Sequence, residues 1–407
     1  MSKKEKKPST IRRFASCIGE YKVPTILTPV FMIGEVGLEV LMPFITADLI
    51  SEIQHGCGLD VIVKYGITLF VMALLSLGCG AAGGYTASKA SAGFAKNLRY
   101  KIFDKVQTFS FESIDKFSSS SLVTRMTTDI NNVQMSFMMI IRSAIRSPMM
   151  FIFAILMAFL KGGKLAFTFV IVIPVLVFGL ILIAKKAMPA FHAVFKKYDK
   201  MNEAIEENVT AMRTVKGFVR EDYEKNKFEN AADSIRREFT KAERIVAFNN
   251  PLMNICLYFN MVFILAVGSK LIIGSQGTVL DVGALSALIT YGVQVLMSLM
   301  MLSMIYVMIT LSIESVRRIG EVLDEESTLR SPENAVEVIP DGSIDFEDVG
   351  FKYSAKAERF ALSDIDLHIK SGETIGIIGG TGSSKSTLIQ LIPRLYDATV
   401  GTVKVGG

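Results

Sequence analysis

The feature that most constrains the fold of this chain is the length of its apolar segments. A membrane-spanning helix needs about 20 apolar residues, and six segments of the 407-residue sequence reach that length. One such segment could be a core helix of a soluble protein, but six in one chain predict an all-α polytopic membrane domain over residues 23–320. The segments are Pro24–Ile53, Leu59–Tyr85, Met135–Leu160, Leu165–Ala184, Ala247–Ile273 and Val282–Thr310.

The distribution of charge predicts how these helices are oriented. The links after the second and fourth apolar segments are long and rich in Lys and Arg, and we expect helical extensions there; the other three links are short. Basic segments favour the cytoplasmic side, so we expect a multi-pass protein of the plasma membrane with both the N-terminal segment, residues 1–22, and the C-terminal domain in the cytoplasm. The N-terminal segment contains no signal-peptide pattern, and it carries Lys3, Lys4, Lys6, Lys7, Arg12 and Arg13.

Composition argues against several other functions. The net charge of +5 mostly reflects the basic links, and no basic patch interleaved with aromatic residues indicates nucleic-acid binding. The cysteines have no CxxC spacing and are expected at different depths, so they support neither a disulfide framework nor a metal centre. They are Cys17, Cys57, Cys79 and Cys256.

A second domain is predicted over residues 343–407, after an acidic, proline-containing linker at 321–342. Alternating apolar and polar residues predict strands at 344–347 and 362–369. The apolar run Thr374–Ile378 predicts a buried strand that leads into a glycine-rich loop and then a helix. This order is typical of an α/β phosphate-loop domain. The roughly 65 residues that follow the linker are too few to form a self-sufficient core for such a domain.

The loop predicts a site for ATP and Mg²⁺. Glycines let backbone amides approach a polyphosphate, Lys385 would reach the outer phosphates, and Ser386 would bind the metal ion. Ser384 stands where the motif has glycine; at negative φ it preserves the anion cradle, whereas at positive φ its Cβ strains the loop. No catalytic residue is predicted. The expected nucleotide-binding residues of the loop are Gly379, Gly380, Thr381, Gly382, Ser383, Ser384, Lys385, Ser386 and Thr387.

Four charged residues lie deep within the apolar segments, 14 to 18 residues from their outer ends. Glu35 and Glu39 are one helical turn apart in the first segment, and Arg142 and Arg146 are one turn apart in the third. An unpaired charge at such depth costs at least about 2.5 kcal/mol, so we expect a ladder of two ion pairs, Glu39 with Arg146 and Glu35 with Arg142. The ladder could serve only as an inter-helix clamp, or its charges could line a cavity and contact a compound that enters it.

Methionines recur at helical spacing in the sixth apolar segment. Their flexible, polarizable side chains suit a surface that accepts varied apolar compounds, and ordinary helix packing explains the spacing equally well. These residues are Met297, Met300, Met301, Met304 and Met308.

Taken together, the order of these features resembles a half-transporter of the ABC exporter family with the type IV exporter fold, and the resemblance covers the whole chain. It implies that Tyr353 stacks on the adenine ring and that the segments near Phe111–Phe117 and Thr210–Phe218 are coupling helices, the second of which reaches the partner subunit. The resemblance is strongest in Phe351-Lys352-Tyr353-Ser354, Gly379–Thr387, Arg213-Thr214-Val215-Lys216 with Glu221-Asp222, and Thr124-Arg125-Met126-Thr127-Thr128-Asp129.

The resemblance also implies a second half-transporter as partner, identical or not, and ATP-driven export of an amphipathic compound, peptide or lipid by alternating access. The family's glutamine loop, signature motif, Walker B acidic pair and switch histidine are not found after the phosphate loop. We therefore expect a chain truncated within its nucleotide-binding domain that does not hydrolyse ATP alone. The alternative is a non-catalytic or regulatory nucleotide-binding membrane subunit.

Overall fold

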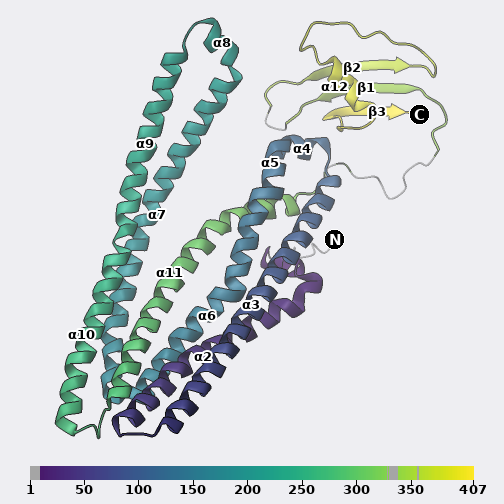
Figure 1. The fold of residues 1–407 in the computed structure, drawn as a ribbon. Helices are drawn as coiled ribbons and strands as arrows, with labels where there is room; N and C mark the ends of the chain where they lie inside the picture. Colours follow the sequence, from purple (N-terminus) through teal and green to yellow (C-terminus); the bar gives the residue numbers. More distant parts are fainter. Residues whose placement is uncertain (1–9, 328, 330–337, 355–356) are drawn as a thin grey trace. The chain divides into compact units, whose positions relative to one another are not determined.

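The computed structural model describes residues 10–327, 329, 338–354 and 357–407 (Figure 1). The chain forms two compact units, each assembled from separate segments. The first contains Met1–Tyr21, Ser91–Ser136 and Thr310–Gly407, and the second contains Lys22–Ala90 and Phe137–Ile309. Lys3, Lys4, Lys6 and Lys7, which predict a cytoplasmic N-terminal segment, lie outside the described residues.

Four of the six apolar segments lie within a long helix, and the other two, Leu165–Ala184 and Ala247–Ile273, begin two residues before theirs, so the predicted all-α membrane domain is confirmed. By length and composition, five continuous helical stretches of the described chain could cross a membrane. One of them, Ser119–Thr210, contains two of the long helices, which are joined by the 3-10 turn η3 (Gly163–Ala166). The long helices are α2 (Lys22–Gln54), α3 (Leu59–Gln107), α6 (Ile130–Gly162), α7 (Phe167–Thr210), α10 (Asn249–Ser275) and α11 (Val282–Asp324).

Small and apolar side chains form the core of the second unit. Ala154 and Ala158, one turn apart on α6, are fully buried, and small residues at such spacing let neighbouring helices approach closely. Tyr291 of α11 is also fully buried, and its hydroxyl donates a 3.0 Å hydrogen bond to the carbonyl of Val40 on α2. Outward faces carry large exposed apolar side chains, such as Phe70 on α3, which lipid would cover. The chain is therefore a multi-pass membrane protein.

Beyond its apolar segment, α7 continues as a polar helix alongside α9 (Glu221–Ala247), and the two are joined by the short α8 (Met212–Gly217) (Figure 1). Lys227 of α9 forms a 3.0 Å ion pair with Glu207 of α7. The helical extensions expected from the charged links are thus present, and α8 falls within the segment where the sequence predicts a short coupling element.

In the first unit, short helices connect α3 to α6. They are α4 (Phe111–Phe117), α5 (Ser119–Thr124) and the π-helical turn η2 (Arg125–Asp129). The hydroxyl of Ser110 caps α4 by accepting a hydrogen bond from the backbone N–H of Ser113. Two short N-terminal helices, α1 (Thr10–Ser16) and the 3-10 helix η1 (Gly19–Tyr21), belong to the same unit.

Side chains of η2 pack against the end of α11. Asp129 is 4% exposed; it accepts a 2.9 Å hydrogen bond from the hydroxyl of Ser315 and forms a 3.3 Å ion pair with Arg318. Arg125, 9% exposed, pairs with Glu321 at 3.1 Å. A buried charge is stable only when it is paired, so these contacts fix the end of α11 against η2.

The C-terminal segment contains a three-stranded antiparallel sheet in the order β2-β1-β3, with β1 at Ile344–Phe351, β2 at Leu362–Ile369 and β3 at Val400–Val405. Phe346 in the central strand pairs with Leu367 on one side and Val403 on the other, and its side chain is fully buried. The strands predicted from alternation are therefore confirmed. The helix α12 (Lys385–Leu391) contributes Leu391 to the same core.

The buried strand predicted at Thr374–Ile378 is not formed. This segment has no regular secondary structure, and Ile375, Ile377 and Ile378 are 40%, 40% and 98% exposed. A buried strand needs hydrogen-bonding neighbours and covered faces, and no strand in the described part of the chain pairs with this segment. The apolar run gives the segment strand propensity, but the propensity alone does not make a strand.

Candidate nucleotide-binding site and transmembrane cavity

The glycine-rich loop curls around the side chain of Lys385. The Lys385 ammonium donates hydrogen bonds of 2.8 and 2.7 Å to the carbonyls of Gly379 and Gly380, and a longer one of 3.2 Å to the hydroxyl of Ser383. Gly382 adopts a left-handed conformation with φ of +84°. Left-handed residues in such a loop turn successive backbone N–H groups towards one concave side, which can hold an anion.

Ser384 also has a left-handed backbone, with φ of +59°. Of the two alternatives left open by the sequence, this is the strained one. The left-handed backbone conformation costs a residue with a Cβ atom roughly 1–2 kcal/mol, whereas for glycine the cost is close to zero. The loop thus adopts this conformation at an energetic cost that the usual glycine would avoid.

The remaining loop residues fit ATP and Mg²⁺. Gly379, Gly380, Thr381, Gly382 and Ser383 are all exposed, and a Cβ atom added at Gly380 or Gly382 would meet nothing within 4 Å. The backbone there is therefore open to a ligand. Ser386 is exposed, and its hydroxyl has no hydrogen-bond partner within the described chain, so it is available to a metal ion. The described residues contain no cluster of three metal-binding side chains; bound phosphate oxygens would supply the other ligands.

Two predicted nucleotide-binding residues contact each other. The hydroxyl of Tyr353 lies 2.9 Å from the hydroxyl of Thr387, which is only 5% exposed. The ring of Tyr353 stands edge-on to Phe351 and to Tyr396, with centroid distances of 4.9 and 5.4 Å, and remains 48% exposed. An exposed aromatic ring linked to the phosphate-loop helix is suited to stack on an adenine ring.

Tyr396 was not predicted from the sequence, although it connects this aromatic group to α4. Its hydroxyl donates a 2.7 Å hydrogen bond to the carboxylate of Asp115, and its ring lies 6.1 Å from that of Phe111. Burial of Tyr396, followed by its hydrogen bond to Asp115, raises its pKa to about 12. The Tyr396 hydroxyl therefore remains a donor at neutral pH. No sequence motif indicates which tyrosine would make this contact.

In the membrane domain, Arg146 binds both glutamates of α2. Its Nη2 atom donates to the two carboxylate oxygens of Glu39 at 2.9 and 2.7 Å and lies 3.6 Å from a carboxylate oxygen of Glu35. The predicted pair between Glu35 and Arg142 is not formed, because carboxylates one turn apart can reach a single planar guanidinium. Arg142 is exposed and makes no ion pair with any residue that the structure describes. The ladder is therefore one cation bridging two anions.

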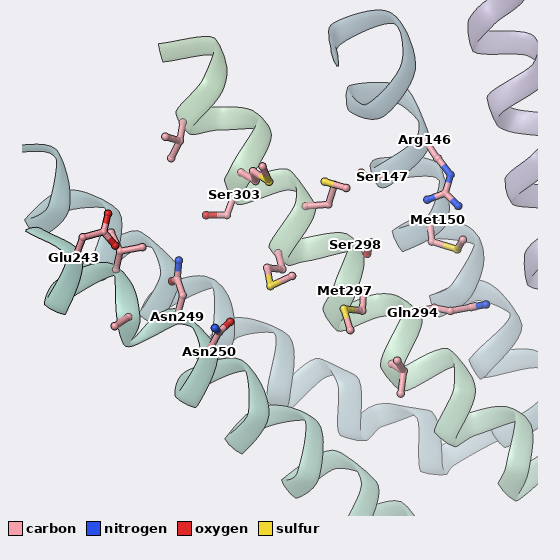
Figure 2. A pocket seen from close by; sticks show the side chains of 17 residues that line it. Arg146, Ser147, Met150, Glu243, Asn249, Asn250, Gln294, Met297, Ser298 and Ser303 are labelled. Carbon is pink, nitrogen blue, oxygen red and sulfur yellow. The ribbon is translucent and has the colours of Figure 1, made fainter. Parts of the chain in front are cut away.

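A cavity of about 760 Å³ lies in the second unit, between α6, α11 and the junction of α9 with α10 (Figure 2). Its apolar wall is made largely of methionines, and polar side chains from all these helices border it. Met308 is not among its lining residues, so four of the five methionines predicted as one face share this cavity. The principal lining side chains are Met150, Met297, Met300, Met301, Met304, Arg146, Ser147, Gln294, Ser298, Ser303, Glu243, Asn249 and Asn250.

A helical membrane domain joined to a phosphate-loop segment defines a membrane protein of the ATP-binding transporter class. Residues 25–299 match the family model of the ABC transporter transmembrane region, and residues 362–407 match the family model described as ABC transporter. The chain therefore belongs to the ABC transporter family, as the resemblance in its sequence implies.

The relatives of this chain carry the same family name. The chain is 30% identical over 395 residues to the uncharacterized ABC transporter ATP-binding protein YfiB of Bacillus subtilis, which covers 97% of this chain and 68% of that protein. It is 28% identical over 368 residues to the uncharacterized ABC transporter ATP-binding protein Rv1273c of Mycobacterium tuberculosis, covering 90% and 62% of the two proteins. The chain thus spans about two thirds of the length of these relatives.

Proposed function

We propose that this chain is a half-subunit of an ATP-driven exporter that moves amphipathic compounds, peptides or lipids across the plasma membrane. The observation that carries the proposal is the loop around Lys385, in a chain that also contains the membrane region of the ABC family. The proposed working form is a dimer with a second, identical or different, half-transporter. ATP hydrolysis is proposed for the dimer, which would alternate between inward- and outward-facing states.

In the proposed site, the backbone of residues 379–384 and the Lys385 ammonium hold the phosphates of ATP. Ser386 would bind Mg²⁺ and Tyr353 would stack on adenine. When bound, the nucleotide supplies the free energy for the conformational change. Lys385 would exchange its present bonds to the carbonyls of Gly379 and Gly380 for charged phosphate oxygens, and a bond to an anion is the stronger of the two.

The short helices α4 and α8 are proposed to transmit nucleotide binding to the membrane helices, with the N-terminus and the phosphate loop in the cytoplasm. The bond between Tyr396 and Asp115 supports this role for α4, because Tyr396 also contacts the proposed adenine-stacking residue. The proposed domain boundaries remain at residues 22, 320 and 342; α11 crosses the second of these and ends at Asp324, in the proposed linker.

A second candidate function is that of a nucleotide-binding subunit that regulates a partner without driving transport. The left-handed backbone of Ser384 favours it, because the Cβ atom makes the unliganded loop adopt this conformation less readily than the usual glycine would, and ATP binding is weakened by that fraction. The two candidates differ in whether the partner's transport activity requires ATP bound to this loop.

Binding of photoreactive ATP to the purified chain in lipid nanodiscs tests the common part of both functions. We expect labelling within residues 353–387 that requires Mg²⁺ and is abolished in Lys385→Ala. The matched control is Lys352→Ala, since Lys352 Nζ bonds the carbonyl of Ala357 and lies outside the loop. Labelling that persists in Lys385→Ala would overturn the proposal. Restoration of transport by a co-expressed half-transporter, with and without Lys385→Ala, then separates the two candidates.

A further inference from the structure

We propose that the methionine-lined cavity selects amphipathic cations, in particular those with an alkylammonium group, over neutral and anionic amphiphiles. The inference deepens the proposed function, on which it rests, by naming the class of transported compound. The cavity volume of about 760 Å³ is in the range that encloses drug-sized ligands.

The first observation is the balance of charge around the cavity wall. Arg146 is the lining cation, and its guanidinium is already bound by the two glutamates of α2. Two carboxylates against one guanidinium leave this group with a formal charge of −1. A buried oxygen of Glu35, Oε2, has no hydrogen-bond partner in the described chain, so the excess negative charge is not compensated there.

The second observation is a carboxylate at the other side of the cavity. Glu243, near the end of α9, lines the cavity and forms no ion pair or hydrogen bond with any described residue. Together with the group around Arg146, it gives two centres of net negative charge beside the cavity, and the cation Arg142, one turn from Arg146, does not line it. A cation that enters the cavity gains from both groups; the low dielectric of the surrounding helices strengthens the attraction to the partly buried group around Arg146, whereas Glu243 is exposed. An anion would meet the same field as repulsion.

The third observation concerns hydrogen bonding. The side-chain oxygens of Asn249 and Gln294, two lining residues from different helices, are buried and accept no hydrogen bond from any described residue. Buried acceptors normally have a donor. An amide side chain that presents this oxygen to the cavity could accept a hydrogen bond from an ammonium N–H there. The methionine sulfur atoms, weak acceptors with high polarizability, suit the alkyl part of the same ligand.

The test uses the full chain in lipid nanodiscs without nucleotide. Rhodamine 6G, a cationic dye with N–H donors, serves as the fluorescent probe, and empty nanodiscs correct for its partition into lipid. Decylammonium, decanol and decanoate, which share one alkyl chain, then compete for the site. We expect decylammonium to displace the dye at a concentration about tenfold lower than decanol does, and decanoate to be weakest. Equal competition by all three, or stronger competition by decanoate, would overturn the proposal.

Two variants locate the preference in the cavity. Glu243→Gln and Gln294→Leu should each weaken decylammonium competition severalfold while leaving that of decanol almost unchanged. The matched control is Glu229→Gln, which alters an exposed carboxylate on the same helix outside the cavity. A loss of charge preference in the control equal to that in Glu243→Gln would also overturn the proposal.

The competition series on the unmodified chain decides the question even where a variant does not fold. Photolabelling by ATP in the same preparation separates this inference from the proposed function. ATP labelling without a preference for cations would overturn the cavity proposal alone. A preference for cations without Lys385-dependent labelling would instead overturn the ATP-driven function.

Discussion

The guanidinium of Arg146 donates hydrogen bonds of 2.9 and 2.7 Å to the two carboxylate oxygens of Glu39. This contact joins α6 to α2 deep within their apolar segments, and Glu35 approaches the same cation at 3.6 Å. Removal of the cation would leave two carboxylates facing each other in a medium of low dielectric, so this pair is expected to matter more for folding than any other charge in these segments.

The first prediction concerns reversal of these charges. Arg146→Glu places three carboxylates together and should destabilise the chain by about 3 kcal/mol. Glu39→Arg should cost less, because Glu35 remains to pair with either arginine. The double variant Glu39→Arg with Arg146→Glu keeps the number of each charge and should recover most of the loss. Thermal unfolding in detergent, followed by circular dichroism, measures the three effects.

Arg142 provides the control for this prediction. It lies one turn from Arg146 on α6 but is exposed and has no ion pair within the described chain. Arg142→Glu should therefore shift the unfolding temperature much less than Arg146→Glu. An equal shift would mean that total charge on α6, and not the contact with Glu39, determines stability.

A second prediction follows from the left-handed backbone of Ser384, with φ of +59°. Ser384→Gly should tighten ATP binding by up to about fivefold, because glycine removes a strain of roughly 1–2 kcal/mol and so raises the fraction of unliganded loops that already hold this conformation. Ser384→Ala retains the Cβ atom and should bind ATP as the unmodified chain does. Titration with a fluorescent ATP analogue distinguishes these outcomes; equal gains in both variants would show that the hydroxyl, and not the backbone, limits affinity.

The third prediction tests the contact between η2 and the end of α11. Asp129→Asn removes the buried charge that pairs with Arg318 at 3.3 Å, and should destabilise the first unit by about 2 kcal/mol. Glu314→Gln breaks an exposed pair with Arg317 and should cost under about 1 kcal/mol. Protection of the η2 amides against hydrogen exchange should fall in the first variant only, and loss of protection in both would assign the effect to α11 charge in general.

The membrane helices could be predicted because the bilayer requires a long apolar run for each of them. The bounds of α4, Phe111–Phe117, also match the segment indicated by sequence. The missing strand at Thr374–Ile378 shows where this reasoning stops. A helix satisfies its backbone from its own residues, whereas a strand depends on neighbours that local sequence does not specify.

Residue types within the candidate sites were predicted better than their contacts. The charges of α2 and α6 were correctly expected to pair, but which arginine receives both glutamates depends on side-chain reach. The bond between Tyr396 and Asp115 joins residues 281 positions apart, and no local pattern encodes such a separation. For Ser384 the sequence left two alternatives, a negative or a positive backbone φ, because the folded loop determines this angle.

The last prediction concerns that bond. Tyr396→Phe removes the hydroxyl that donates to Asp115 and should raise hydrogen exchange in α4 about fivefold, equivalent to roughly 1 kcal/mol. Tyr353→Phe is the matched control, because the Tyr353 hydroxyl bonds Thr387 and not α4.

The same tyrosine gives the free energy of unfolding a pH dependence of definite sign. The pKa of Tyr396 is raised to about 12 from the ordinary value of 10, so the folded state holds the proton more tightly than the unfolded state. The contribution of Tyr396 to stability is therefore complete below about pH 10 and is lost as the pH rises from about 10 to 12. In Tyr396→Phe this part of the alkaline loss should disappear. Unchanged exchange in α4, or an alkaline transition identical to that of the unmodified chain, would show that Tyr396 does not hold α4.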